Sequence, residues 1–412
     1  MVIMIESVGL QKATILLPRG IPYESWAVIA CDQYTAEPAY WEDVERLVGD
    51  APSTLRLTLP ERYLGEPDAE RRQQAITATM RAYVKDGLFQ ELPDSLLYCE
   101  RVFSDGRVRR GLIGAVDLEA YDFRLGAASL IRATEGTVLG RLPPRVKVRR
   151  DALLELPHVM LLMDDIGDLV FGPLSGRKEE SEKQYDFKLM MGGGTISKGV
   201  FDALSALKSQ AAAGGKAPLL LAVGDGNHSL AAAKQWWETL KPTLPPAERE
   251  RHPARYALAE ICNLHEPSLQ FEPIHRTVFG VAPPAVMAGL VQLLGLSPRP
   301  VESAQSFVAV EKGEQVRYWI TTPLSALTVG SLQMALDALL PAIGGTVDYI
   351  HGDDVAVRLS RQPDTISFLL PSMRKEELFP SVIQDGALPR KTFSMGHAEE
   401  KRYYLEARRI RE

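Results

Sequence analysis

The chain has 412 residues, of which 45% are hydrophobic and 24% charged, the composition of a water-soluble globular protein. Its formal net charge of −6 disfavours a general nucleic-acid binder, because such proteins usually carry a basic excess. No apolar run approaches the roughly 20 residues that cross a bilayer, and the first residues do not resemble a secretory signal. Three widely separated cysteines without a CxxC pair disfavour a disulfide framework, so we expect a reducing cytoplasmic location and no membrane association.

The length predicts two domains, since one hydrophobic core rarely grows this large. The clearest break is at residues 241–253, where prolines give way to a dense charged run. We therefore expect one domain at residues 1–240 and a second at 254–412. Strands and helices alternate without a regular βαβ repeat, which favours an α+β (mixed α/β) fold over a Rossmann domain.

Hydrophobic periodicity and turn residues predict the elements of the first domain. In chain order they are a helix at 38–49, a helix at 68–86, a hairpin of strands 96–103 and 108–118, a strand at 158–163, a helix at 178–190 and a helix from Thr195 or Ser197 to Ala213. Asp105-Gly106 supplies the positive φ angles that the tight hairpin turn needs. Beyond the break we expect strands at 255–264, 306–310, 316–321 and 365–370, and helices at 283–294, 330–340 and 374–384.

The segment Pro218-Leu-Leu-Leu-Ala-Val-Gly-Asp-Gly-Asn-His-Ser229, which runs on to Trp237, predicts a buried strand, a tight turn and a helix. Its polar residues are Asp225, Asn227, His228 and Ser229. They fall between the carboxyl end of the strand and the amino end of the helix, where N–H groups and the helix dipole favour anions. Asp225 and His228 then become candidates for acid–base chemistry. The alternative is local capping, with Asn227 or Asp225 as the N-cap and Gly224 and Gly226 making the turn.

A second polar cluster runs from Arg132 to Arg150, with six basic residues against the single acid Glu135. Arg132 and Arg145 are candidates to bind phosphate or carboxylate, because guanidinium groups make bidentate contacts to both. Thr137 lies in the same segment. Glu135 would stay ionised among these cations and is a candidate base. A solvated salt-bridge network is the alternative.

A third cluster lies near the C-terminus, in Leu388-Pro-Arg-Lys-Thr-Phe-Ser-Met-Gly-His397 and the residues that follow to Arg402. Arg390, Lys391 and His397 alternate there with hydroxyl and apolar side chains. We expect this segment to fold back and close the pocket, with these three side chains facing an anion. The apolar residues around them argue against a disordered tail.

A metal site is a further possibility, because four histidines could act as its ligands. They are His228, His275, His351 and His397. Such scattered histidines are more often structural, and no HExxH or HxH spacing is present, so we assign no metal ligands.

Five motifs in order resemble the domain of unknown function 1015 family over nearly the whole chain. They are Trp26-Ala-Val-Ile-Ala-Cys-Asp-Gln33, Ile131-Arg-Ala-Thr-Glu-Gly-Thr137, Gly224-Asp-Gly-Asn-His-Ser229, Pro273-Ile-His-Arg276 and Leu388-Pro-Arg-Lys-Thr-Phe-Ser394. This family implies no established reaction. The third motif also resembles the strand-to-helix motif of the ParB and sulfiredoxin superfamily, which includes nucleotide-dependent free-serine kinases.

The superfamily resemblance implies a ParB/sulfiredoxin-like core, nucleotide phosphates at this motif, and a glutamate elsewhere as base. Asp225, Gly226 and His228 match the motif. Asn227 stands in place of a histidine, and Ser229 in place of the arginine that would contact phosphate. The phosphate would then be bound by N–H groups of the helix and by arginines elsewhere, such as Arg132 or Arg145.

The sequence therefore favours a cytoplasmic enzyme that binds a nucleotide or other phosphorylated small molecule, with kinase-like phosphoryl transfer as its reaction. Asp225, His228 and Glu135 are the candidate catalytic residues. The candidate ligand-binding residues are Arg132, Thr137, Arg145, Gly226, Asn227, Ser229, Arg390, Lys391 and His397. Mg²⁺ would accompany a nucleotide. Two alternatives remain, a non-catalytic regulator that binds a phosphorylated ligand or a nucleic-acid end, and a metal-dependent hydrolase.

Overall fold

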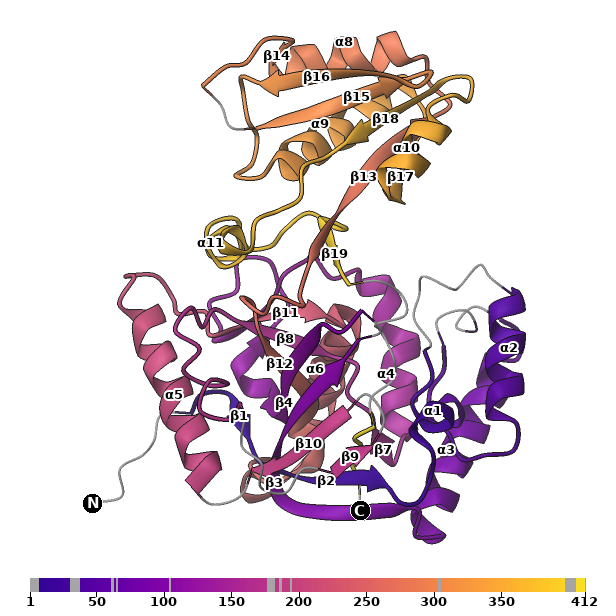
Figure 1. Ribbon diagram of the computed structural model, residues 1–412, viewed down its shortest axis with the longest axis vertical. Coiled ribbons are helices and arrows are strands. Elements are labelled where there is room, and N and C mark those ends of the chain that lie inside the picture. Colours follow the sequence, from indigo (N-terminus) through magenta and orange to yellow (C-terminus); the bar gives the residue numbers. More distant parts are fainter. Residues whose placement is uncertain are drawn as a thin grey trace. The chain divides into compact units, whose positions relative to one another are not determined.

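The computed structural model describes residues 7–29, 38–60, 63, 66–103, 105–175, 182–184, 187–192, 195–302, 305–396 and 405–411. The chain forms two compact units, coloured in sequence order in Figure 1. Unit 1 comprises Met1–Leu269 and His397–Glu412, and unit 2 comprises Gln270–Gly396. Both units combine a sheet with helices, so the α+β class predicted from the sequence is confirmed.

The predicted boundary segment, residues 241–253, lies within unit 1. It contains a short 3-10 turn, Lys241–Thr243, the short helix α7, Pro246–Arg249, and the start of a second 3-10 turn, Pro253–Arg255. It then leads into strand β12, Tyr256–Asn263, which pairs with β4 and β8 of the same sheet as the preceding elements. The chain leaves unit 1 only after Leu269, and its last residues return to that unit.

The sheet of unit 1 has 11 strands among the described residues. Their order is β5 (Tyr121–Asp122), β6 (Ile131–Ala133), β11 (Leu221–Asp225), β8 (Met160–Met163), β12, β4 (Val108–Asp117), β3 (Phe89–Val102), β10 (Phe187–Gly192) and β9 (Glu182–Gln184), with β1 (Leu10–Gln11) beside β4 and β2 (Ala13–Pro18) beside β3. A separate pair is formed by β7 (Leu154–Glu155) and β20 (Arg408–Arg409). Strands β5, β6 and β11 run parallel, whereas β8 runs antiparallel to β11.

Helices cover both faces of this sheet. Those of unit 1 include α1 (Tyr23–Trp26), α2 (Pro38–Val48), α3 (Ala69–Lys85), α4 (Leu142–Asp151), α5 (Thr195–Ala212) and α6 (Asn227–Leu240). Successive residues of β3 point to opposite faces, as a strand requires. Leu96 and Tyr98 belong to the core that includes buried residues of α5 and α6, whereas Leu97 and Cys99 belong to the core that includes those of α3.

Two sequence predictions in unit 1 need correction. Residues 178–190 were expected to be helical, but the described part of this segment forms strands β9 and β10. Strand β10 pairs with β3 from Phe187↔Arg101 to Gly192↔Leu96, so sheet pairing overrides the local helical pattern. In addition, the arginine-rich segment contains the helix α4, which was not predicted. A proline occupies the first turn of α4, a position where proline is common in helices.

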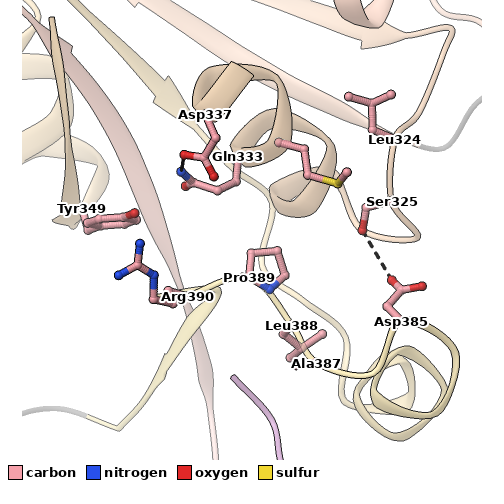
Figure 2. A pocket seen from close by; sticks show the side chains of 11 residues that line it. Leu324, Ser325, Gln333, Asp337, Tyr349, Asp385, Ala387, Leu388, Pro389 and Arg390 are labelled. Carbon is pink, nitrogen blue, oxygen red and sulfur yellow. Dashed lines mark hydrogen bonds between the residues drawn. The ribbon is translucent and has the colours of Figure 1, made fainter. Parts of the chain in front are cut away.

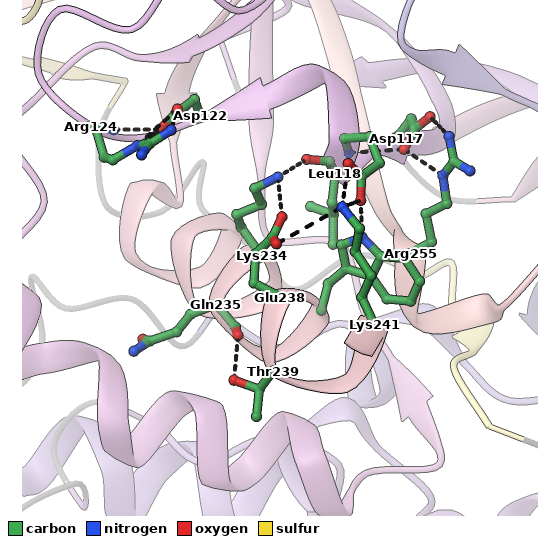
Figure 3. Close-up of polar contacts among 12 residues, drawn as sticks. Asp117, Leu118, Asp122, Arg124, Lys234, Gln235, Glu238, Thr239, Lys241 and Arg255 are labelled. Carbon is green, nitrogen blue, oxygen red and sulfur yellow. Dashed lines mark hydrogen bonds and ion pairs between the residues drawn. The ribbon is translucent and has the colours of Figure 1, made fainter. Parts of the chain in front are cut away.

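The C-terminal half of α6 is fixed by polar contacts to the turn after β4 (Figure 3). Trp237, which is fully buried, donates from Nε1 to Glu119 Oε1 at 2.5 Å, and Lys241 pairs with the same carboxylate at 2.8 Å. Lys234 Nζ donates to Leu118 O at 2.8 Å. These contacts fix the helix relative to the sheet, and with it the position of its first turn.

The sheet of unit 2 is antiparallel, in the order β14 (Leu296–Ser297), β16 (Glu314–Ile320), β15 (Ser306–Glu311), β18 (Thr365–Leu369), β13 (Phe271–Phe279) and β17 (Thr346–His351). Strand β19 (Phe393–Met395) pairs with the start of β13. The helices are α8 (Pro283–Leu294), α9 (Thr328–Ile343), α10 (Asp353–Leu359) and α11 (Leu378–Asp385). Strands β15, β16 and β18 and helices α8, α9 and α11 correspond to predicted elements, whereas β13, β14, β17, β19 and α10 were not predicted. No helix in the described parts of either unit is long and apolar enough to span a membrane.

Candidate functional site

Two of the predicted polar motifs lie side by side in unit 1. Strands β6 and β11 pair in parallel, with Ile131 opposite Leu221 and Ala133 opposite Val223. Their carboxyl ends therefore lie at the same edge of the sheet, which is where α/β sheets tend to bind ligands. Thr134 Oγ1 donates to Val223 O at 2.6 Å and joins the two ends. Residues 134–138, here called the β6 loop, thus lie beside the turn that leads from β11 into α6.

This turn depends on a glycine. Gly226 is the N-cap of α6 and has a φ of 81°, in the left-handed region. A Cβ at this position would lie 2.8 Å from His158 O, so no other residue fits without displacing the backbone. Asp225 Oδ1 accepts a hydrogen bond from Gly226 N at 2.7 Å. Helix α6 therefore begins at Asn227, which is its first residue and not its cap.

The first turn of α6 faces the β6 loop. Ser229 N and Leu230 N both donate to Gly226 O at 3.0 Å, which closes the first turn. The N–H groups before them have no acceptor within the helix, because α-helices leave their first donors unpaired. These donors and the helix dipole favour an anion at this position.

His228 connects the helix to the β6 loop. Its Nε2 accepts a hydrogen bond from Val138 N at 3.3 Å. Since Nε2 is the acceptor, the neutral ring carries its proton on Nδ1. This contact gives His228 a positioning role, because it holds the loop against the helix.

Two buried oxygens in these loops lack a hydrogen-bond partner among the described residues. They are Thr137 Oγ1 of the β6 loop and Asn227 Oδ1 of the first turn of α6. Buried polar atoms are nearly always paired in folded proteins, so each requires a group that is absent from these described residues. The hydroxyl of Thr137 can donate to an anion, whereas Asn227 Oδ1 needs a donor such as a hydroxyl group or a water molecule.

One further side chain at this site was missed by the sequence analysis. His158 Nε2 lies 3.2 Å from Ser229 Oγ, within hydrogen-bond distance. His158 precedes β8, and the antiparallel pairing of β8 with β11 places Met160 opposite Asp225. The sequence predicts the strand that follows His158, but no sequence signal shows that this strand pairs with β11.

The arginines of the second cluster do not all belong to this site. Arg132 is buried, with 4% of its surface exposed, and its guanidinium donates to Ser129 O and Ala217 O, both at 2.8 Å. These carbonyls precede β6 and β11, so Arg132 fixes the amino ends of the strands, opposite to the ends that carry the candidate site. This position does not fit the phosphate-binding role expected for Arg132.

Arg145 lies on α4, the helix that follows the β6 loop. Its Nη1 donates to Arg141 O at 2.8 Å, at the start of this helix. Helix α4 packs against α6 through Leu142, Ala231 and Ala232. Arg149, on the same helix, forms an ion pair with Glu155 at 2.5 Å and has a structural role.

The C-terminal cluster is divided between the units. Arg390 and Lys391 belong to unit 2, and His397 lies outside the described residues, as do residues 30–33 of the first family motif. The buried guanidinium of Arg276 donates to Arg390 O at 3.1 Å and to Lys391 O at 3.0 Å. Two further family motifs thus meet within unit 2.

The histidines do not assemble into a common site among the described residues. His275, in unit 2, accepts from Leu370 N at Nδ1 and lies 2.7 Å from Asp353 Oδ1 through Nε2, so both ring nitrogens are engaged. Burial lowers the pKa of His275, although Asp353 opposes this effect. The described residues contain no group of three or more His, Cys, Asp or Glu side chains placed to hold a metal ion.

Comparison with known proteins identifies the family. The model of the family described as "Protein of unknown function (DUF1015)" matches residues 16–339. The chain belongs to this family. The DUF1015 match includes the β6 loop and the β11–α6 turn. No curated protein matched the chain.

Several solved structures resemble the chain distantly. A C-terminally truncated SbnI from Staphylococcus aureus shares 12% sequence identity over 69% of this chain and 82% of its own, with a TM-score of 0.38. A free serine kinase mutant in complex with ADP shares 10% over 71% and 89%, with a TM-score of 0.39. A conserved hypothetical protein from Pyrococcus furiosus shares 12% over 72% and 93%, with a TM-score of 0.36.

Proposed function

We propose that unit 1 binds a nucleotide or another phosphorylated small molecule between the β6 loop and the first turn of α6, and that its reaction is phosphoryl transfer. The observation that carries this proposal is the pair of unpartnered buried oxygens, Thr137 Oγ1 and Asn227 Oδ1, beside the amino end of α6. The helix end favours phosphate, and the Thr137 hydroxyl is a second donor for it.

The two oxygens also indicate the kind of ligand. Inorganic phosphate near neutral pH retains one or two protons, so the only donor that it can offer to Asn227 Oδ1 is its own P–OH group. A ligand that carries both phosphate and hydroxyl groups satisfies both oxygens. Nucleotides and sugar phosphates carry these two kinds of group at separate positions, which suits two separate oxygens.

Each remaining residue of the site has a distinct role in this proposal. Gly226 gives the turn its shape, since its N–H already donates to Asp225. Ser229, paired with His158, lines the first turn of α6. Glu135 of the β6 loop is the proposed base that accepts the proton of an attacking hydroxyl group. Arg145 supplies positive charge from α4 to the phosphates.

We propose Asp225 as the carboxylate that would hold a magnesium ion at this site. Mg²⁺ is usually held by one or two carboxylates together with substrate phosphates and water, and it needs no larger protein cage. When bound, the ion would neutralise phosphate charge. Asn227 Oδ1, which lacks a donor among the described residues, is a suitable acceptor for a water molecule of such an ion.

A thermal-shift screen of the full chain with ADP, ATP, GTP and pyrophosphate, with and without Mg²⁺, tests the binding step. A ligand at 100 times its Kd stabilises the folded state by about 2.7 kcal/mol, which is readily detected. We expect a nucleotide to raise the melting temperature. If none of these compounds does so, the proposal is wrong.

Phosphorus NMR of ATP incubated with the chain and a mixture of small hydroxyl compounds tests the reaction. We expect Glu135→Gln to keep the nucleotide-induced thermal shift and to slow phosphate transfer by roughly 10²–10⁴-fold, the usual contribution of a general base. Exposed Glu302→Gln in unit 2 is the matched control and leaves both unchanged. Binding without any transfer would instead make the protein a non-catalytic sensor of the same ligand.

A further inference from the structure

Unit 2 contains a cavity of about 420 Å³, a size typical of small-molecule sites (Figure 2). Its wall comes from α9, β17 and the segment between α11 and β19. The lining residues are Leu324, Ser325, Gln333, Met334, Asp337, Tyr349, Asp385, Ala387, Leu388, Pro389 and Arg390. All of them belong to unit 2, so the cavity is distinct from the candidate site in unit 1.

A buried arginine organises the wall of this cavity. Arg276 is fully buried, and its guanidinium lies over the ring of Tyr349, 4.7 Å from the centroid. It donates from Nε to Gln333 Oε1 at 2.7 Å and from Nη2 to Arg390 O at 3.1 Å. One side chain thus fixes parts of β17, α9 and the loop before β19. Such support is typical of a preorganised binding site.

Charges of both signs face the cavity. Gln333, whose Oε1 is held by Arg276, donates from Nε2 to Asp337 Oδ1 at 2.8 Å and so fixes that carboxylate. The side chain of Arg390 and the hydroxyl of Tyr349 have no hydrogen-bond partner among the described residues. Figure 2 shows Asp337, Tyr349 and Arg390 on one side of the cavity, with Ser325 and Asp385 on the other, 3.5 Å apart.

We propose that this cavity binds a zwitterionic amino acid or short peptide. The ligand carboxylate pairs with Arg390, and its ammonium group pairs with Asp337. The apolar part of the ligand contacts Leu324 and Met334. With two lining carboxylates and a single lining guanidinium, the cavity repels phosphates and other polyanions, so its ligand differs in kind from that of unit 1.

The test is calorimetric titration of the full chain with L-leucine and with the dipeptide leucyl-leucine. 4-Methylpentanoate, which is leucine without its amino group, and isoamylamine, which is leucine without its carboxylate, are the matched compounds. We expect at least one zwitterion to bind and both matched compounds to bind about tenfold or more weakly, because each loses one ion pair in the cavity. The titrations are made without nucleotide, so their result is independent of the proposal for unit 1.

Two substitutions assign the binding to this cavity. Arg390→Gln and Asp337→Asn change exposed side chains, and each is expected to weaken binding about tenfold or more. Arg299→Gln and Glu302→Gln change exposed charges elsewhere in unit 2 and leave binding unchanged. Binding that survives both cavity substitutions would contradict the assignment. The absence of binding by either zwitterion at millimolar concentration would overturn the proposal.

Discussion

Gly226 is the residue on which the geometry of the unit 1 site depends most directly. Its φ of 81° and the 2.8 Å approach of His158 O to a Cβ at this position exclude other side chains. We predict that Gly226→Ala lowers the free energy of unfolding by about 1–3 kcal/mol, the usual cost of local backbone strain, as measured by urea denaturation. Gly140→Ala, where a Cβ meets nothing within 4 Å, is the control. Equal urea midpoints for the two variants would contradict this account of the turn.

Glu155 couples the stability of unit 1 to pH. Burial raises the pKa of its carboxyl, but Arg149 and Arg408 outweigh this effect and hold the pKa below its ordinary value. The ionised form therefore stabilises the fold above the ordinary pKa of glutamate, and this contribution is lost as pH falls through the lowered pKa. We predict that Glu155→Gln costs ~3–5 kcal/mol at neutral pH, because it leaves the buried guanidinium of Arg408 and the partly buried one of Arg149 without their carboxylate.

Urea denaturation between neutral pH and about pH 3.5 measures this coupling. The difference between the wild-type chain and Glu155→Gln should shrink as the pH falls. The control is Glu91→Gln, whose partner Arg409 and own side chain are both about half exposed, and it should cost less than about 1 kcal/mol. A constant difference across the pH range would show that ionisation of Glu155 is not responsible.

At the level of residues, the sequence predicts where polar groups gather better than what each one does. Asp225, His228 and Thr137 were expected near one another, and the parallel pairing of β6 and β11 explains why they are. The role of Arg132 was not predictable, because its carbonyl partners become neighbours only when the strands pair. For the same reason, no sequence signal connects His158 with Ser229.

Among the elements, the β6 loop and the first turn of α6 are linked through the side chain of His228. Val138 N donates to His228 Nε2 at 3.3 Å. We predict that His228→Ala increases the hydrogen-exchange rate in residues 134–138 and leaves α6 protected, as measured by mass spectrometry. His265→Ala, which removes a ring paired with Asp164, is the control. Unchanged exchange in the β6 loop of His228→Ala would contradict the positioning role.

The prediction of elements succeeded where a local signal decides the structure. The Asp105-Gly106 hairpin, α6 and α8 follow from turn residues and periodicity. The helix predicted at residues 178–190 was wrong, because strand β10 in this segment is stabilised by pairing with β3, which is distant in sequence. Helix α4 was missed because its charged and proline-rich sequence lacks an apolar face of ordinary width.

At the scale of the whole molecule, the last residues of the chain belong to the core of unit 1. Trp26 Nε1 donates to Leu405 O at 3.2 Å, and Leu16 N donates to Ala407 O at 2.8 Å. Arg408 pairs with Glu155 in a buried site. We predict that a chain ending at residue 404 loses hydrogen-exchange protection throughout unit 1, whereas unit 2, which is one continuous segment, keeps its own. Equal protection of unit 1 with and without these residues would contradict this.

The central claim, that the first turn of α6 binds phosphate, is tested most directly by calorimetric titration of ADP into two charge variants of the full chain. Asn227→Asp places a carboxylate at the first residue of α6, where it favours the helix by about 0.3–1 kcal/mol but repels a phosphate. Gln235→Glu adds the same charge at an exposed position farther along this helix. The account predicts that Asn227→Asp is folded but binds ADP at least about tenfold more weakly than the wild-type chain, whereas Gln235→Glu binds as the wild type does. Equal ADP binding by Asn227→Asp and Gln235→Glu would contradict it.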